Sequence, residues 1–232
     1  MSRRIPTRPA RSRTRAPWCP CRSLKGSSRA RSRWRESCGR EGHLLSLDRQ
    51  LAEKVRVLVL DVDGVLTRAQ IVLGTEGELL MEFSARDGIG IKIAQHAGIE
   101  VTFLSARAPA IVERRAKMLG VTDVRLGHER KLPIVREIAG ERGVALENVA
   151  YVGDDLVDRE PVASVGLGVA VGDACRDLKE ATPFVTEAPG GGGAVREVVE
   201  AILRARGEWS DTVDAYFERL AERRSRAGGR EE

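Results

Sequence analysis

Two aspartates separated by one residue, Asp61 and Asp63, follow an apolar stretch of the chain. The four residues before them, 57–60, are all Val or Leu, which is typical of a strand buried on both faces of a parallel sheet. Residues two apart share a face while the chain stays extended, so both carboxylates can point at one centre. Two like charges at that distance require a cation or a shared proton. A helix cap or an Asx turn explains one aspartate here but not the pair, so the spacing favours a catalytic or metal site.

Five further polar residues follow other predicted strands or open a predicted helix. They are Ser105, Lys131, Asp154, Asp155 and Asp158. Because ligands bind beyond the carboxyl ends of the strands in open α/β sheets, we expect these side chains to converge with Asp61 and Asp63 in one crevice. Carboxylates with a main-chain oxygen form the all-oxygen site that Mg²⁺ prefers. A hydroxyl beside an ammonium suits a phosphoryl group.

The same residue types supply the parts that phosphoryl transfer needs. An aspartate held by a metal can act as the nucleophile and form an aspartyl-phosphate. A second carboxylate two residues on can protonate the leaving oxygen and later take a proton from water. Taken singly, Ser105 is explained as a helix cap, Lys131 as a solvated helix residue and Asp158 as a surface charge. Their joint occurrence in this order favours the catalytic interpretation.

Strand-like and helix-like segments alternate after residue 57. The predicted strands cover 57–60, 99–104, 121–126, 149–152 and 167–171, with a weaker sixth at 184–185. The predicted helices cover 44–55, 86–97, 109–118 with Pro109 in the first turn, 131–142 and 194–206. Short apolar runs around a glycine-bounded turn predict a hairpin at 71–80, inside an insertion of about 69–83. This order predicts an α/β fold with a doubly wound, three-layer Rossmann-like parallel sheet.

The charge of the chain is unevenly distributed. Residues 1–40 contain twelve Arg and one Lys against a single Glu, a net of +12, so residues 41–232 carry −7 of a total of +5. Residues 1–46 are rich in Arg, Ser and Pro, and such a segment cannot bury enough surface to offset its ordering entropy. We expect a disordered basic leader there, or an upstream stretch translated from a misassigned start. A catalytic domain at 47–206 and a charged tail at 207–232 follow.

Cysteine usage and hydropathy exclude several classes of protein. Cys19, Cys21 and Cys38 lie in the leader without the paired CxxC spacing of a zinc site. Cys175 alone in the body fits a reducing compartment, so we expect a cytoplasmic protein. No apolar run approaches the ~18–20 residues that span a bilayer, so we expect no membrane partner.

Four motifs resemble, in order, those of the haloacid dehalogenase-like (HAD) phosphatases. They are 61–67 (DVDGVLT), 104–105 (LS), Lys131 and 153–158 (GDDLVD). Within that superfamily, about residues 55–206 are similar to the capless 3-deoxy-D-manno-octulosonate 8-phosphate (KDO 8-phosphate) phosphatases. The stretches that carry this match are 86–90 (RDGIG), 147–155 (ENVAYVGDD) and 190–198 (GGGGAVREV). Ordered motifs of this kind are too specific to arise by chance.

The resemblance implies a HAD-like fold without a large cap domain, a Mg²⁺ cofactor and a role for each motif residue. Asp61 would be the nucleophile and a metal ligand, and Asp63 the acid/base and a ligand through its carbonyl. Asp154 would complete the metal ligands. The residues expected at the phosphate or the substrate are Gly64, Ser105, Ala106 and Lys131. Asp158 would orient Lys131, and Asp155 would contact the water shell of the metal.

The resemblance also implies an assembly. Capless members close their sites by forming oligomers, usually tetramers, so we expect a homotetramer with the hairpin at 71–80 in the interface. The glycine-rich loop at 188–193 would then reach the site of a neighbouring subunit. Four consecutive glycines suit a mobile lid better than a core element.

The substrate implied is KDO 8-phosphate, within KDO and lipopolysaccharide biosynthesis. Arg86 and Arg107 are candidate partners for the carboxylate of such a sugar acid, because a guanidinium binds a carboxylate bidentately. Three departures from the family pattern leave the sugar open: Arg68-Ala69 in place of Asp-Gly, Ala106 in place of Gly, and Gly192 in place of a basic residue. The alternatives are an acylneuraminate or KDN 9-phosphate, or a broader set of HAD substrates.

Two functions without catalysis compete with this interpretation. A phosphorylation-switched receiver also clusters Asp, Ser or Thr and Lys around Mg²⁺. Its acceptor aspartate lies at a later strand, however, and it has no need of Asp63. The basic leader would bind nucleic acid electrostatically, but it offers only Trp18 and Trp34 for stacking, so we expect no nucleic-acid partner.

Overall fold

Strand β1 (Val57–Asp61) is the centre of the sheet, and all five of its residues are buried. The computed structural model describes residues 47–75 and 77–228, so the expectations for the basic leader lie outside the described residues. β1 pairs in parallel with β4 (Glu100–Ser105) on one side and with β6 (Val149–Gly153) on the other. A run of Val and Leu suits this place because both faces of the strand meet apolar side chains.

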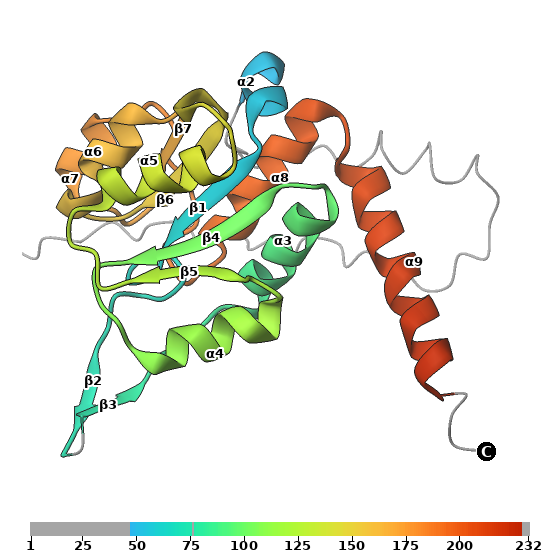
Figure 1. Ribbon diagram of the computed structural model, residues 1–232, viewed down its shortest axis with the longest axis horizontal. Coiled ribbons are helices and arrows are strands. Elements are labelled where there is room, and N and C mark those ends of the chain that lie inside the picture. Colours follow the sequence, from blue (N-terminus) through green and yellow to red (C-terminus); the bar gives the residue numbers. More distant parts are fainter. Residues whose placement is uncertain (1–46, 76, 229–232) are drawn as a thin grey trace, which may run out of the picture. The chain divides into compact units, whose positions relative to one another are not determined.

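The sheet has the order β5-β4-β1-β6-β7, and every pairing in it is parallel (Figure 1). The edge strands are β5 (Asp123–Leu126) and β7 (Leu167–Ala170). The chain runs from β1 to β4 and β5 on one side and then crosses to β6 and β7 on the other, and crossovers in opposite directions place helices on both faces of a parallel sheet. This arrangement confirms the predicted doubly wound, three-layer sheet. Its order reverses between β1 and β6, which is where such sheets bind ligands.

The helices among the described residues are α2 (Arg49–Lys54), α3 (Ala85–His96), α4 (Ala110–Leu119), α5 (Lys131–Glu141), α6 (Arg159–Ser164), α7 (Arg176–Glu180), α8 (Ala194–Arg206) and α9 (Trp209–Gly228), with 3-10 turns η1 (Leu146–Asn148) and η2 (Leu156–Asp158). The helices predicted at 86–97, 109–118, 131–142 and 194–206 are present close to those bounds, and α6, α7 and α9 lie where no helix bounds were predicted. The helix predicted at 44–55 is shorter, because Asp48 caps α2, and residues 44–46 lie outside the described residues. Pro109 occupies the cap position before α4 and not the first turn.

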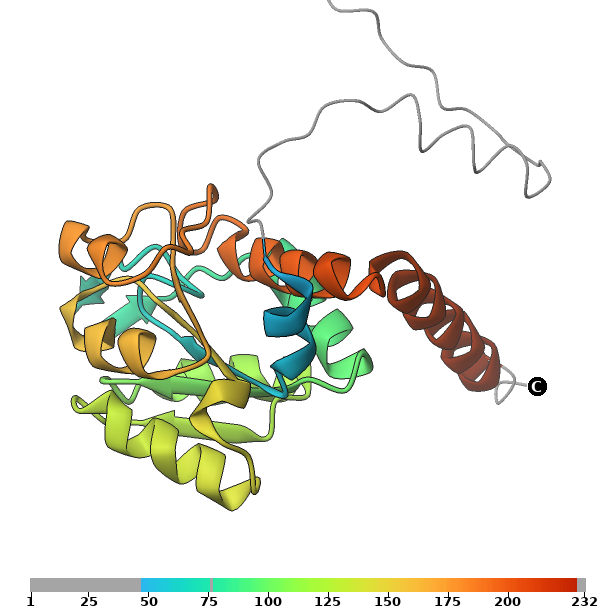
Figure 2. The same ribbon diagram turned by 90° about the horizontal axis from the view of Figure 1, so that it is seen from above.

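Helix α8 packs closely against α3. Its buried residues Val195, Val198, Val199 and Ile202 recur at helical spacing and form one apolar stripe. The two helices approach so closely that a Cβ at Gly90 would lie 2.9 Å from the Cα of Arg196. α9 continues from the end of α8 (Figure 2), so the part of the charged tail that the structure describes is mainly helical. Within the described ranges, none of the helices has the length and apolar character that a membrane crossing needs.

The predicted hairpin is formed by β2 (Val72–Gly74) and β3 (Gly77–Leu80), an antiparallel pair that follows β1 in the chain (Figure 1). It exposes apolar side chains: Ile71, Leu73 and Leu80 are 50%, 70% and 55% exposed. The hairpin is the insertion between β1 and α3, and the described residues contain no large cap domain there.

The sixth strand predicted at 184–185 is wrong. Val185 forms only an isolated parallel bridge with Ala170, the last residue of β7. The ladder cannot continue because the hydroxyl of Thr182 lies between its two backbones. This hydroxyl accepts the N–H of Phe184 at 3.1 Å and donates to the carbonyl of Gly168 at 2.6 Å.

The turn that follows residues 64–67, after β1, contains an alanine with a left-handed backbone conformation. Ala69 has φ of 56° and is the one non-glycine residue with positive φ among those the structure describes. This conformation costs an L-residue about 1–2 kcal/mol. The position is one at which the sequence departs from the family pattern, where Gly is usual, so the departure places strain in this turn.

We expect Ala69→Gly to raise the free energy of unfolding by about 0.5–1 kcal/mol. Glycine adopts positive φ without strain, and the gain exceeds its larger entropy loss on folding. Denaturant unfolding of both proteins measures the difference. The matched control is Ala215→Gly, at an exposed position inside α9, which should lower stability by about 0.5–1 kcal/mol. Equal losses at the two positions would contradict strain at residue 69.

Candidate active site

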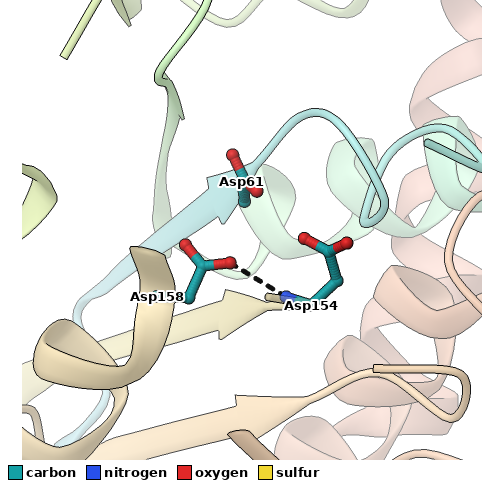
Figure 3. A group of neighbouring side chains, drawn as sticks. All are labelled: Asp61, Asp154 and Asp158. Atoms are coloured by element: carbon teal, nitrogen blue, oxygen red, sulfur yellow. Dashed lines mark hydrogen bonds between the residues drawn. The ribbon is translucent and has the colours of Figure 1, made fainter. Parts of the chain in front are cut away.

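The carboxyl ends of β1 and β6 bring three aspartates together. Asp61 is the last residue of β1, Asp154 follows β6, and Asp158 ends η2. One oxygen of each carboxylate lies within 4.8 Å of the others, and Figure 3 shows the side chains grouped at the ends of the two strands. The convergence that the strand ends predict is therefore present.

Lys131 joins two of these carboxylates. It is the first residue of α5 and is 2% exposed. Its Nζ lies 2.7 Å from Asp61 Oδ1 and 2.6 Å from Asp158 Oδ1. Burial acts to lower the pKa of Lys131, but the charges of the two aspartates outweigh it, so the net effect is a raised pKa. The residue is a buried ammonium held at Asp61, and not a solvated helix residue.

Asp158 is completely buried and surrounded by donors. Its Oδ1 accepts from Lys131 Nζ and from the Tyr151 hydroxyl, both at 2.6 Å. Its Oδ2 accepts the backbone N–H groups of Asp154 (2.9 Å) and Asp155 (3.2 Å). A carboxylate has about four acceptor positions, so these donors use its capacity and leave no position for a metal ion. The geometry makes Asp158 an anchor for Lys131 and for the backbone after β6.

Tyr151 is a site residue that the motif spacing does not reveal. It lies in β6 and is completely buried. Burial and the charge of Asp158 raise the pKa of Tyr151 well above its ordinary value, so its hydroxyl keeps the proton that it donates. The available signal was a tyrosine inside an otherwise aliphatic strand, because a buried phenol usually needs a hydrogen-bond partner.

The electrostatics of the cluster favour a cation. Three carboxylates against one ammonium leave a net charge of −2 when all are ionised. Burial, followed by the charge of Asp158, raises the pKa of Asp61 well above its ordinary value despite the opposing effect of Lys131. Burial and Asp158 also raise the pKa of Asp154 to about 7. A divalent ion at Asp61 and Asp154 would remove this repulsion, and oxygen donors suit Mg²⁺, so the residues present fit this cofactor.

A second group of contacts surrounds Asp63. Ser105 Oγ donates to Asp63 Oδ2 at 3.3 Å, and Arg107 Nη1 lies 2.9 Å from Asp63 Oδ1. Ser105 is completely buried, and its Oγ also accepts the N–H of Arg107 at 3.0 Å. Ser105 does not cap the next helix, since Pro109 occupies the cap position of α4. The hydroxyl instead links Asp63 to the loop after β4.

The loop at 64–67 lies against Asp154. Gly64 has φ of 88°, and a Cβ there would lie 1.9 Å from Asp154 Oδ2. Thr67 is the last residue of the first motif, and the sequence assigned it no role. It closes the loop: its Oγ1 donates to the carbonyl of Val62 and accepts the N–H of Gly64, both at 3.3 Å. A glycine is needed at residue 64 because the aspartate approaches the backbone directly.

The other predicted site residues lie further from these contacts. Arg86 is exposed in the first turn of α3 and makes no hydrogen bond or ion pair with the aspartates in the part of the chain that the structure describes. Ala106 is half-buried directly after β4. Asp155 is exposed, and its Oδ1 accepts the N–H of Leu156 at 2.8 Å, which caps η2. The structure thus joins Arg107 to the site but not Arg86.

The glycines at 190–193, here called the glycine loop, pack against the 64–67 loop of the same chain. The N–H of Gly191 donates to the carbonyl of Val65 and that of Gly190 to Asp173 Oδ1, both at 2.8 Å. Gly190 is buried, and a Cβ there would lie 1.6 Å from the carbonyl oxygen of Gly64. The absence of side chains lets two backbones touch within one chain. The predicted contact with a neighbouring subunit stays a prediction.

Comparison with known proteins shows which family and which proteins the chain is similar to. Residues 125–197 match the family model described as haloacid dehalogenase-like hydrolase. The 3-deoxy-D-manno-octulosonate 8-phosphate phosphatase of Escherichia coli is 45% identical over 157 residues, which are 68% of this chain and 84% of that protein.

Two solved structures are similar along nearly their whole length. One is the 3-deoxy-D-manno-octulosonate 8-phosphate phosphatase of Moraxella catarrhalis in complex with magnesium ion, phosphate ion and KDO. Its TM-score is 0.70 at 33% identity, covering 72% of this chain and 97% of that one. The other is the cobalt-bound deoxy-D-mannose-octulosonate 8-phosphate phosphatase of Haemophilus influenzae. Its TM-score is 0.66 at 39% identity, covering 68% and 92%.

Sequence and fold agree in this comparison. The 45% identity covers 84% of the Escherichia coli protein, which exceeds what a shared fold alone explains. The chain therefore belongs to the haloacid dehalogenase-like hydrolases, in the family of the 3-deoxy-D-manno-octulosonate 8-phosphate phosphatases.

Proposed function

We propose that this chain is a Mg²⁺-dependent phosphomonoesterase that hydrolyses KDO 8-phosphate to KDO and inorganic phosphate. The observation that carries the proposal is the group of Asp61, Asp154 and Asp158, the first and last of them buried, with the ammonium of Lys131 2.7 Å from Asp61. Relatives that bear this name, one of them holding magnesium, phosphate and KDO, support the substrate class. This activity belongs to KDO and lipopolysaccharide biosynthesis, and the free thiol of Cys175 supports a cytoplasmic location.

Asp61 is the proposed nucleophile. One of its oxygens attacks phosphorus, the bond between phosphorus and the sugar oxygen breaks, and an aspartyl-phosphate forms. Asp63 gives its proton to the departing oxygen and later takes a proton from the water that attacks phosphorus and releases Asp61. Lys131 contacts Asp61 and Ser105 contacts Asp63, so both donors can hold phosphoryl oxygens between the two carboxylates.

The proposed Mg²⁺ ligands are Asp61, Asp154 and the main-chain carbonyl of Asp63, with Asp155 at the water shell of the ion. When bound, Mg²⁺ neutralises charge on the phosphoryl oxygens. Asp158 has its oxygens occupied by protein donors, which supports its role in orienting Lys131 over a role as a ligand.

Gly64 and Ala106 directly follow Asp63 and Ser105, and they complete the proposed phosphate site. Arg107, which pairs with Asp63 in the structure, is the first candidate for the carboxylate of the sugar acid, because its guanidinium lies in the site and matches a carboxylate. Arg86, exposed at the start of α3, is the second candidate.

The proposed assembly is a homotetramer with the hairpin in the interface. The exposed side chains of Ile71, Leu73 and Leu80 support this proposal, because an apolar patch of this kind usually marks an interaction surface. Association at the hairpin would also cover the site, which lacks a cap domain in the described chain.

A panel of phosphate esters tests the activity. With Mg²⁺ present, we expect kcat/KM for KDO 8-phosphate to exceed that for acylneuraminate 9-phosphate, KDN 9-phosphate and a simple aryl phosphate by at least about tenfold. Steady-state phosphate release measures the ratio. Equal slow turnover of all esters would contradict a specific substrate, and a stable phospho-protein without turnover would indicate a receiver-like module.

We expect Asp61→Asn to lower kcat by at least about 10⁴-fold, because the substitution removes the nucleophile and one metal ligand. The fold should persist, since one of three crowded carboxylates is lost. Phosphate release and circular dichroism measure the two effects. The matched control is Asp177→Asn, an exposed aspartate in α7, which should keep kcat within about twofold. Near-native turnover of Asp61→Asn would refute the assignment.

Asp63→Asn separates the two carboxylate roles. Loss of the acid/base should lower kcat by about 10²–10⁴-fold, and the aspartyl-phosphate should accumulate if its hydrolysis is the slower step. Acid-quenched labelling with phosphate-labelled substrate detects that species. Labelling of Asp61→Asn to the same extent would show that another residue is the nucleophile.

The metal-free protein should lose stability as pH rises. The pKa of Asp154 is about 7 in the folded chain and 3.8 ordinarily, so the folded state holds this proton more tightly. The stabilising contribution of the proton is present at low pH and is lost as pH rises towards about 7. Thermal unfolding in a chelator measures this trend, and Mg²⁺ should reduce it. Asp154→Asn should also reduce it without metal, and an unchanged slope in that variant would contradict the assignment to Asp154.

A further inference from the structure

Asp87 is a buried carboxylate that none of the proposed chemical steps uses. It lies in the first turn of α3 and is 1% exposed. Its Oδ2 accepts the backbone N–H of Gly193 at 3.2 Å, and its Oδ1 accepts that of Arg196 at 2.9 Å. It forms no ion pair with any residue that the structure describes. The N–H groups at the start of α8 therefore stabilise its negative charge.

The first turn of α8 depends on Asp87 for its cap. Gly193 occupies the cap position with φ of 120° and has no side chain that could accept the free N–H groups. A carboxylate at a helix N-terminus accepts these groups and also complements the positive end of the helix dipole. A residue of α3 thus performs the task that the cap side chain performs in most helices.

The glycine loop connects this cap with the active site. Gly193 is the last residue of the loop, and at its other end a Cβ on Gly190 would lie 1.6 Å from the carbonyl oxygen of Gly64. Between them, the N–H of Gly191 donates to the carbonyl of Val65 at 2.8 Å. No side chain separates the two backbones, so a displacement of the glycine loop displaces residues 64–67 as well.

Residues 64–67 in turn lie next to two of the proposed metal ligands. Gly64 lies against Asp154 so closely that a Cβ there would be 1.9 Å from its Oδ2. The loop also begins one residue after Asp63, whose carbonyl is a proposed ligand. The position of the 64–67 loop therefore sets the distance between two proposed metal ligands, the carbonyl of Asp63 and the carboxylate of Asp154.

We infer that Asp87 is a positioning residue for the Mg²⁺ site. By capping α8 it holds the glycine loop against residues 64–67, and this backbone contact keeps Asp61, Asp63 and Asp154 at the spacing that one ion requires. The inference rests on the proposed function for the identity of the ion. A cap that serves only the helix would make a different prediction, namely a loss of stability with unchanged affinity for Mg²⁺.

The variant Asp87→Asn tests this. The amide keeps the shape of the side chain, but its NH₂ group faces one of the two N–H groups and cannot accept from it. We expect the dissociation constant for Mg²⁺, measured by calorimetry on the full chain without substrate, to rise about 3- to 30-fold, the range of a connected network. Saturating Mg²⁺ should restore most of kcat. Hydrogen exchange at Gly191 should accelerate at least about tenfold, since its bond to Val65 opens more often.

The matched control is Ile202→Val, which removes one buried methyl group from the apolar stripe of α8 without touching the cap. It should lower the unfolding midpoint while Mg²⁺ affinity and exchange at Gly191 stay near native. If both variants weaken Mg²⁺ binding equally, or if Asp87→Asn leaves the affinity and the exchange unchanged, Asp87 serves only the stability of the helix and the inference is overturned.

The test also separates this inference from the proposed function. Calorimetry and hydrogen exchange need no substrate, so a chain that binds Mg²⁺ but does not hydrolyse KDO 8-phosphate would refute the function and leave the coupling measurable. If the native chain bound no Mg²⁺ at all, the function and this inference would both fail, and exchange at Gly191 would still report whether Asp87 holds the loop.

Discussion

The contact of Lys131 with two buried aspartates is the constraint on which the rest of the site depends. Removing an ion from water costs several kcal/mol even after relaxation, so buried carboxylates need partners. Lys131, with its Nζ 2.7 Å from Asp61 and 2.6 Å from Asp158, supplies one positive charge for three carboxylates. The remaining −2 is what a divalent cation neutralises. The same balance would suit a phosphoryl group, because the ammonium of Lys131 and a bound divalent ion would each offer it positive charge.

The fold satisfies this constraint through backbone proximity. Parallel strands bring Asp61 and Asp154 to one edge of the sheet, although they are far apart in the sequence. Glycines then remove the obstacles to close approach. A Cβ at Gly153 would lie 2.4 Å from the Cβ of Asp158. The lack of a side chain at Gly64 leaves room for Asp154 in the same way. The glycine loop extends this packing to α8. Backbone without side chains therefore borders the metal site on two sides, and its carboxylates have little room to move.

The sheet and its strand-end aspartates were predictable from the sequence because they follow from local patterns. The Val and Leu run that ends at Asp61 predicts the position of one carboxylate without any distant contact. The GDD motif at the end of β6 does the same for Asp154. What escaped prediction depends on contacts between distant segments. Asp87 resembled any first-turn aspartate, and its partners lie on α8. Thr182 ended the expected sixth strand through one hydroxyl. The glycine loop was predicted to be mobile from its composition, but its packing depends on residues 64–67.

The bridge from Lys131 to Asp61 and Asp158 has a consequence for the pairing of the strands themselves. Asp61 ends β1, and Asp158 follows β6. A parallel pair of Val-rich strands has little to distinguish one alignment from the next. If β6 slid by one residue along β1, each of its side chains would move to the opposite face, and Asp158 would be carried along with Tyr151 and away from Asp61. The ammonium could then no longer contact both carboxylates, so the alignment that it favours is the one that assembles the site.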